Sequence, residues 1–376
     1  MSRGFLSGLK ALLRLKPRQR LTGQYLLSLL IAVALAFLVG AGIMALCGYD
    51  PLRCYAELFT GALGKRRALG NTLAKTVTLC LTGLATAVAA KAGIFNVGGE
   101  GQLYLGAMAS AVVGARLTGA PSWFIVLMSL LAAMLAGGAY AWLPGVLKVR
   151  WKVNEVVTTI MLNSAAIYFC SYLANGPLKT AERGIASGTD AIDPAAALQK
   201  LIPLSNLTTG VFIAAGVALV VWYVMSRSTI GYEMKMSGEN ERFARYGGVR
   251  ADKLALWAMV ASGAICGVVG LLEVFGLHRR FITSVSNEFY FDGMLVAMIM
   301  RYNPVGIMLM SFFFAILSIG STTMELNVGM SSELILIVQS VIIFFMAAED
   351  GISQRARDRA AARRVRRAAR KGVRKA

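Results

Sequence analysis

The sequence predicts an all-α polytopic membrane protein with about eight to ten transmembrane helices, some of them broken, arranged as two inverted repeats. Of its 376 residues, 57% are hydrophobic and only 15% are charged, whereas about a quarter of the residues in a soluble domain are charged. Uncharged runs near or above the roughly 20 residues that cross a bilayer as a helix recur along the chain. They cover residues 21–49, 117–147, 156–178, 201–226, 254–272 and 302–324.

The net charge of +20 is concentrated at the two ends of the chain. Residues 1–20 hold six Lys or Arg and no acid, and residues 351–376 hold eleven against the single Asp358. Basic segments beside the first and last spans are typical of cytoplasmic ends. We therefore expect a basic cytoplasmic arm over 1–20, a transmembrane domain over 21–350 and a basic cytoplasmic tail over 351–376. The tail has no aromatic residue on which a base would stack, so nucleic acid is not an expected partner.

With the N-terminus inside, the apolar runs form alternating crossings. Residues 175–206 then form an external loop, residues 226–253 lie in the cytoplasm, and Lys148 falls on the inner side as the positive-inside rule requires. The basic run Lys65–Arg67 falls on the outer side, which counts against this layout. Helices are expected at 25–47, 71–90, after Glu100, and at 123–147, 155–174, 208–225, 254–275, 289–300, 304–321 and 334–348.

Two local patterns refine these helices. Ser262, Gly263 and Gly267 form a small-residue face with GxxxG spacing, which lets two membrane helices pack closely. Pro304 cannot continue a helix inward from Met300, so the apolar stretch around it is expected to form two separate or kinked pieces.

The stretch KAGIFNVGGEGQLYLGAM, residues 91–108, interrupts two apolar runs with glycines and an acid. Its glycines allow a helix to break where the backbone faces protein or a water-filled path. Glu100 then stands at the start of the next helix, where it either contacts solute or only stabilises the helix start. The candidates for the translocation pathway are two glycines of this interruption and the polar side chains in apolar surroundings. The glycines are Gly98 and Gly99, and the polar side chains are Asn96, Glu100, Gln102, Asn163, Asp292 and Gln339.

Three segments of the first half recur in the second half in the same order. EGQLYLGAM from Glu100 is similar to DGMLVAMIM from Asp292, and LTGLATAVAAKAG ending at Gly93 is similar to ASGAICGVVG ending at Gly270. NEVVTTIML from Asn154 is similar to SELILIVQS. An odd number of crossings separates the copies, so the repeat is predicted to be inverted, as in many transporters with interrupted helices.

The cytoplasmic stretch 226–253 is expected to carry a short helix that docks on another protein. Ser237 is a possible N-cap with Glu239 and Glu241 in the first turn, and Gly247 is expected to end the helix in a left-handed conformation beside Gly248. A helix of about ten residues is marginal alone in water, so a partner surface is expected to support it. Phe243 and Tyr246 share one face.

These residues carry a family resemblance. GIFNVGGEGQLYLGA, NEVVTTIMLN followed by NGPLK, and GENERFARYGGV leading into ASGAICGVVGLLE resemble the permease subunits of bacterial ABC importers of the branched-chain amino acid and simple sugar group. The likeness spans about residues 70–350 and is strongest to permeases of nucleoside uptake systems. It implies a multi-pass protein of the bacterial plasma membrane, with both termini cytoplasmic, that transports a nucleoside or simple sugar.

The resemblance also implies three protein partners. These are an ABC ATPase subunit, a second homologous permease subunit and an extracytoplasmic substrate-binding lipoprotein. In that family the segment matching Gly238, Asn240, Ala244, Gly247 and Gly248 is similar to the loop that seats in a cleft of the ATPase. Together with Phe243 and Tyr246, these residues form the expected ATPase-coupling set.

Enzyme chemistry is not expected of this chain. It has no Walker A sequence, no HExxH or GxSxG motif and no cysteines at metal-ligand spacing, so no catalytic residue, cofactor or metal is predicted. An ion-coupled secondary transporter stays open as the alternative, because Glu100, Glu155, Asp292 and Glu333 lie at or near membrane depth. Glu155 and Glu333 have a second interpretation as helix-start residues that follow Asn154 and Ser332.

Overall fold

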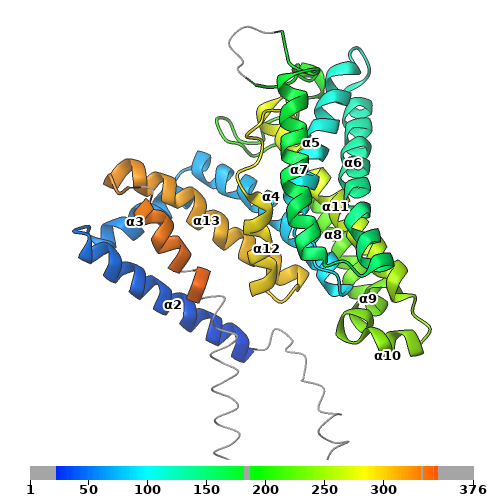
Figure 1. Ribbon diagram of the computed structural model, residues 1–376. Helices are drawn as coiled ribbons and strands as arrows, with labels where there is room; N and C mark the ends of the chain where they lie inside the picture. Colours follow the sequence, from blue (N-terminus) through cyan, green and yellow to red (C-terminus); the bar gives the residue numbers. More distant parts are fainter. Residues whose placement is uncertain (1–22, 182–186, 332, 342, 346–376) are drawn as a thin grey trace, which may run out of the picture. The chain divides into compact units, whose positions relative to one another are not determined.

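The computed structural model describes residues 23–181, 187–331, 333–341 and 343–345, and these residues are predominantly helical (Figure 1). Among them, the β-type pairings are the isolated bridges Gly188–Ile282 and Lys200–Thr208. The chain divides into two compact units, one formed by Met1–Cys54 with Met330–Ala376 and the other by Tyr55–Gly329. The predicted basic arm and basic tail lie outside the described residues.

Apolar helices make up most of the described part of the smaller unit. Helix α2 spans Gly23–Leu46, close to the predicted 25–47. A further apolar helix runs over Glu333–Phe345, where 334–348 was expected, and residues beyond 345 are not described. Ser332, which precedes Glu333 at the expected start of this helix, lies outside the described part of the chain.

The larger unit contains the long apolar helices. Six helices of the described chain are long and apolar enough to cross a membrane, which makes this a multi-pass membrane protein. The helices from α3 onward are α3 (Pro51–Leu63), α4 (Arg66–Lys91), α5 (Gly99–Arg116), α6 (Ser122–Trp151), α7 (Glu155–Asn175), α8 (Gly210–Arg227), α9 (Thr229–Glu239), α10 (Glu241–Tyr246), α11 (Ala251–Glu273), α12 (Phe289–Ile299) and α13 (Pro304–Val328).

The sequence missed α3, which lies between the helices expected at 25–47 and 71–90. It is a 13-residue helix, too short for a search that looks for runs of about 20 apolar residues. Its buried Leu58 packs against Gly320 of α13, where an added Cβ would meet the Leu58 carbonyl. Helix α4 begins at Arg66 rather than at the predicted Asn71, so its first turn includes the basic residues Arg66 and Arg67.

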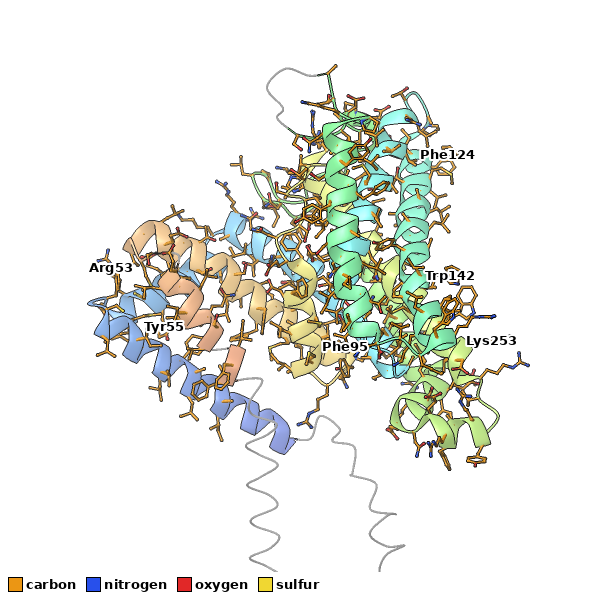
Figure 2. The ribbon with its side chains drawn as sticks, viewed as in Figure 1. Arg53, Tyr55, Phe95, Phe124, Trp142 and Lys253 are labelled. Atoms are coloured by element: carbon orange, nitrogen blue, oxygen red, sulfur yellow. The ribbon has the colours of Figure 1, made fainter. Side chains whose placement is uncertain are left out.

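Helices α4 and α11 run in opposite directions. Where the middle of α4 meets the end of α11, the Thr78 hydroxyl donates to Glu273 Oε1 at 2.9 Å. Just after the end of α4 and near the start of α11, Gly93 and Ala255 line one small cavity. Phe95 and Lys253 accordingly lie toward one end of this unit and Phe124 toward the other (Figure 2). Because α4 and α11 are equivalent in the predicted repeat, their opposite directions agree with the predicted inversion.

The packing of the two repeats is exchanged. Helix α5 packs on α11, and its counterpart α12 packs on α4, so each repeat supplies a short helix to the long helix of the other. Helices α6 and α13 complete the two groups by packing on α11 and α4. The break at Pro304 is confirmed, because α12 ends at Ile299 and α13 begins at Pro304, with the Asn303 side chain capping its start.

The small-residue face of α11 forms the predicted close contact. A Cβ added to Gly263 would meet the Gly137 carbonyl and the Ala141 side chain of α6, and one added to Gly267 would meet the Ala133 carbonyl. Backbones approach this closely only where no side chain intervenes. Glycines of α11 therefore fix the distance between α6 and α11.

Gly263→Val is expected to destabilise the protein, because the added side chain has no room beside α6. Overpacking of a close contact costs about 1–3 kcal/mol. The measurement is the thermal unfolding midpoint of the detergent-purified chain. Gly216→Val is the matched control, since a Cβ at Gly216 in α8 meets no atom within 4 Å. Equal midpoints for the two variants would contradict a tight α6–α11 contact.

Candidate functional site

The glycine-rich interruption lies between α4 and α5. Helix α4 ends at Lys91, and Gly93 then takes a left-handed backbone with φ +83°. The chain continues without helix to Gly98, and α5 begins at Gly99. Most α5 residues from Gly99 to Gly114 are buried, so the broken backbone lies inside the protein, as a break at membrane depth requires.

The start of α5 is joined directly to the start of α12. Glu100 is 4% exposed, and its Oε2 accepts a hydrogen bond at 3.0 Å from the backbone N–H of Tyr290, the second residue of α12. The Tyr290 hydroxyl returns a hydrogen bond to the Asn96 carbonyl in the break. A Cβ at Gly99 would collide with the Tyr290 ring. The acid thus caps a helix of the other repeat, and Gly99 provides the space for that contact.

Three amide side chains hold the break from the other side. Asn96 Nδ2 donates to Gln102 Oε1 at 2.8 Å and to Ser262 Oγ of α11 at 2.9 Å. Asn163 of α7 accepts from Gly101 N and donates to the Val97 carbonyl, both at 2.8 Å. These buried amides therefore form hydrogen bonds with each other and with backbone groups of the break that have no partner within a helix.

The structure brings together six of the eight predicted pathway residues. They are Asn96, Gly98, Gly99, Glu100, Gln102 and Asn163. Asp292 lies two residues after Tyr290, half-buried in the first turn of α12. Gln339 belongs to the smaller unit. What the sequence did not predict is the bond from Glu100 to Tyr290, because a link across 190 residues leaves no local pattern.

The loop between α8 and α11 contains two helices in place of the single predicted one. Ser237 does not cap a helix, because it lies buried inside α9. The cap is Asn240, whose side chain accepts from Phe243 N at 3.1 Å and starts α10. The left-handed glycine is Gly248, with φ +84°, and not Gly247, with φ −78°. Asn is as good an N-cap as Ser, and only the fold decides between them.

The short helix α10 presents aromatics to its surroundings. Phe243 is 63% exposed and Tyr246 is 93% exposed, whereas Ala244 between them is fully buried. Exposed aromatic side chains of this kind are typical anchors of protein interfaces. Figure 1 shows α9 and α10 together at one end of the larger unit.

Close backbone contact joins this loop to the break. A Cβ on Gly238 of α9 would lie 2.5 Å from the Lys91 carbonyl, and one on Gly93 would lie 3.2 Å from Gly238 Cα. Arg245 adds ion pairs to Glu241 at 2.6 Å and to Asp252 of α11 at 2.8 Å. The hydrogen bond to Glu241 and the charge of Asp252 hold the pKa of Arg245 above its usual value. Helix α9 is therefore in backbone contact with the end of α4.

Two more acids have assigned contacts in the structure. Glu155 opens α7 and pairs with Lys148 at 2.7 Å, while Asn154 caps the same helix by accepting from Val156 N. This confirms the helix-start interpretation of Glu155.

The sequence missed Glu273 and Lys75, which line one cavity in the larger unit. A charged residue inside or beside an apolar span is the signal that would have found them.

Comparison with known proteins assigns the family. Residues 68–347 match the family described as branched-chain amino acid transport system / permease component. A guanosine ABC transporter permease protein, NupP of Bacillus subtilis, is 33% identical over 87% of this chain and 94% of its own length.

Two further relatives cover most of the chain. A nucleoside ABC transporter permease protein, NupB of Lactococcus lactis, is 31% identical over 85% of this chain and 89% of its own length. A glucose ABC transporter permease protein of Haloferax volcanii is 30% identical over 84% of this chain and 85% of its own length. No solved structure matches. The chain therefore belongs to the branched-chain amino acid transport system permease family, and it is a transport component rather than an enzyme.

Proposed function

We propose that this chain forms the membrane pathway of an ATP-driven ABC importer for nucleosides. The observation that carries the proposal is the identity of 33% to a guanosine permease over 94% of that relative. The proposed assembly contains an ABC ATPase subunit, a second homologous permease subunit and an extracytoplasmic substrate-binding lipoprotein. It lies in the bacterial plasma membrane, and both termini of this chain are cytoplasmic.

A simple sugar is the second candidate substrate. One relative is named for glucose transport, and the ribose of a nucleoside and glucose share a ring with neighbouring hydroxyl groups. We favour a nucleoside because the guanosine and nucleoside permeases are at least as similar in sequence.

The proposed coupling element is the loop of α9 and α10. Its exposed Phe243 and Tyr246 would enter a cleft of the ATPase, with the other coupling residues shaping the loop behind them. Closure of the ATPase on ATP would move α9, and the contact of Gly238 with Lys91 and Gly93 would pass this movement to the break. In this proposal, a movement of the loop would therefore reach the break between α4 and α5.

The break and the start of α12 form the proposed gate of the pathway. Asn96, Gln102 and Asn163 hold the broken backbone, and Glu100 ties it to α12. Broken helices that meet at a repeat interface are where many transporters place their pathway. In this proposal Gly98 and Gly99 bend with the pathway and Asp292 lines it. Gln339 is proposed separately, as a solute contact within the smaller unit.

The experiment that tests the proposed function is uptake by the complete transporter in proteoliposomes. We expect guanosine uptake that requires ATP inside the vesicles and the binding lipoprotein outside, and that continues when ion gradients are collapsed with ionophores. Uptake that stops with the ion gradient at constant ATP would instead establish the ion-coupled carrier.

Phe243→Ala and Tyr246→Ala are each expected to reduce the amount of ATPase subunit that copurifies with the permease. Loss of an exposed aromatic anchor weakens an interface by about tenfold or more. The measurement is the ATPase-to-permease ratio after affinity purification at several ATPase concentrations. The matched control is Phe212→Ala, because Phe212 is 68% exposed on the membrane-spanning helix α8. A normal ratio in both loop variants would rule out docking through α10.

Glu100 offers a separate test of the ion-coupled alternative. Glu100→Ala removes the acceptor of the Tyr290 N–H, and an unsatisfied buried donor costs about 1–3 kcal/mol of stability. Glu100→Gln keeps an acceptor oxygen, so we expect it to retain most of the thermal stability and most of the ATP-driven uptake. If Glu100→Gln is as stable as the unmodified protein but transports nothing, the charge itself is required, as an ion carrier would need.

A further inference from the structure

A cavity of about 130 Å³ lies among α4, α8, the end of α11, α12 and α13. It is separate from the break described above and was not predicted from the sequence. Its lining is apolar apart from a few polar groups, which is the usual composition of a small-molecule site. The polar and aromatic side chains that line it are Asn71, Lys75, Thr78, Asn206, Thr208, Glu273 and Phe289.

Lys75, one charged group of this cavity, lies over an aromatic ring. Lys75 Nζ lies 3.8 Å from the centroid of the Phe289 ring. Thr78 Oγ1 donates to Glu273 Oε1 at 2.9 Å. The carboxylates of Asp292 and Glu273 are both within electrostatic range of Lys75. The cavity thus presents a donor, an acceptor and an apolar ring surface in one small volume.

Packing alone gives no reason to place these charges here. Lys75 lies within α4, away from the basic residues at the two ends of that helix, and Glu273 is the last residue of the otherwise apolar C-terminal half of α11. A charge at membrane depth is costly. Immediately after Glu273, the helix changes to a π-helical turn over Val274–His278, and Gly276 of that turn lines the cavity. Such π-bulges are frequent at functional sites because they redirect side chains.

The cavity lies far from the coupling loop. Lys75 precedes Lys91 by 16 residues in α4, which places it about 24 Å along the helix axis from the contact with Gly238. Asn71 and Asn206, which also line the cavity, belong to the end of the unit opposite α9, and Asn206 N donates to Asn71 Oδ1 at 2.8 Å. With α9 and α10 in the cytoplasm, as the proposed function requires, the cavity lies toward the side from which an imported solute arrives.

We propose that this cavity is a solute station that binds the neighbouring hydroxyl groups of an uncharged sugar ring, as in the ribose of a nucleoside; this inference rests on the proposed function. Glu273 Oε2 accepts from the hydroxyl pair, and the Lys75 ammonium donates to a hydroxyl or ring oxygen. The edge of Phe289 packs against the carbon skeleton of the ring. The small volume suits a brief stop, because a solute that must move on needs weak binding.

The test measures protection of a cysteine placed in the cavity. Ala74→Cys lines the cavity, and Gln199→Cys is an exposed control outside it. Both are made with Cys47→Ser, because Cys47 is exposed whereas Cys54, Cys80, Cys170 and Cys266 are buried. The assembled transporter is held in lipid nanodiscs without binding protein, and the rate of labelling by a membrane-impermeant maleimide is measured.

Guanosine is expected to slow labelling of Ala74→Cys and not of Gln199→Cys. 2′,3′-Dideoxyguanosine, which lacks the hydroxyl pair, is expected to be about tenfold or more weaker, because a hydrogen bond to a charged group is lost. Glu273→Gln is expected to weaken guanosine protection similarly, whereas Glu57→Gln, outside the cavity, leaves it unchanged. Phe289→Tyr is expected to keep protection and Phe289→Ala to lose it.

The outcomes separate this inference from the proposed function. Equal protection by guanosine and by its dideoxy analogue, or full protection with Glu273→Gln, overturns the hydroxyl site. ATP-driven guanosine uptake without any protection at Ala74→Cys also overturns the station and leaves the importer intact. Absence of both uptake and protection overturns the two together. Guanosine and its dideoxy analogue are also compared in Ala74→Cys with Glu273 unchanged. A Glu273 variant that fails to assemble therefore does not decide the result.

Discussion

The bond from Glu100 to the backbone of Tyr290 is the interaction on which the larger unit depends. Within a membrane, every backbone donor and acceptor of a broken helix must find a partner in the protein. The two repeats solve this by sharing groups: the acid of α5 caps α12, and the hydroxyl of Tyr290 bonds the carbonyl of Asn96. The break between α4 and α5 and the start of α12 therefore each depend on hydrogen bonds from the other repeat.

This shared contact explains several glycines that would otherwise weaken helices. Gly99 leaves room for the Tyr290 ring, and Gly293 of α12 leaves room for Thr82 of α4. Gly263 and Gly267 then bring α6 close to α11. Such contacts pack the long helices closely around the short non-helical segment between α4 and α5. Gly238 of α9 makes backbone contact with Lys91, so the loop of α9 and α10 lies directly against the end of α4 that precedes the break.

Sequence patterns predicted the long helices, the break, the inversion of the repeat and the small-residue face, because each depends on local composition or on spacing along one helix. They failed where the answer depends on contacts between distant segments. The choice of Asn240 over Ser237 as the cap follows from how α9 packs. Glu273 was missed because it ends an apolar run and resembles an interface residue until α4 supplies Thr78 and Lys75 beside it. The short helix α3 falls below the length that a span requires.

Hydrogen–deuterium exchange of the assembled transporter in lipid tests most directly whether the two repeats share one hydrogen-bonded centre. The peptides of interest cover 94–104 and 286–294. The account predicts that both exchange slowly in the unmodified protein and that Glu100→Ala speeds exchange in both to a similar extent, while peptides of α6 stay protected. Faster exchange in the first peptide alone, with α12 unchanged, would contradict the account.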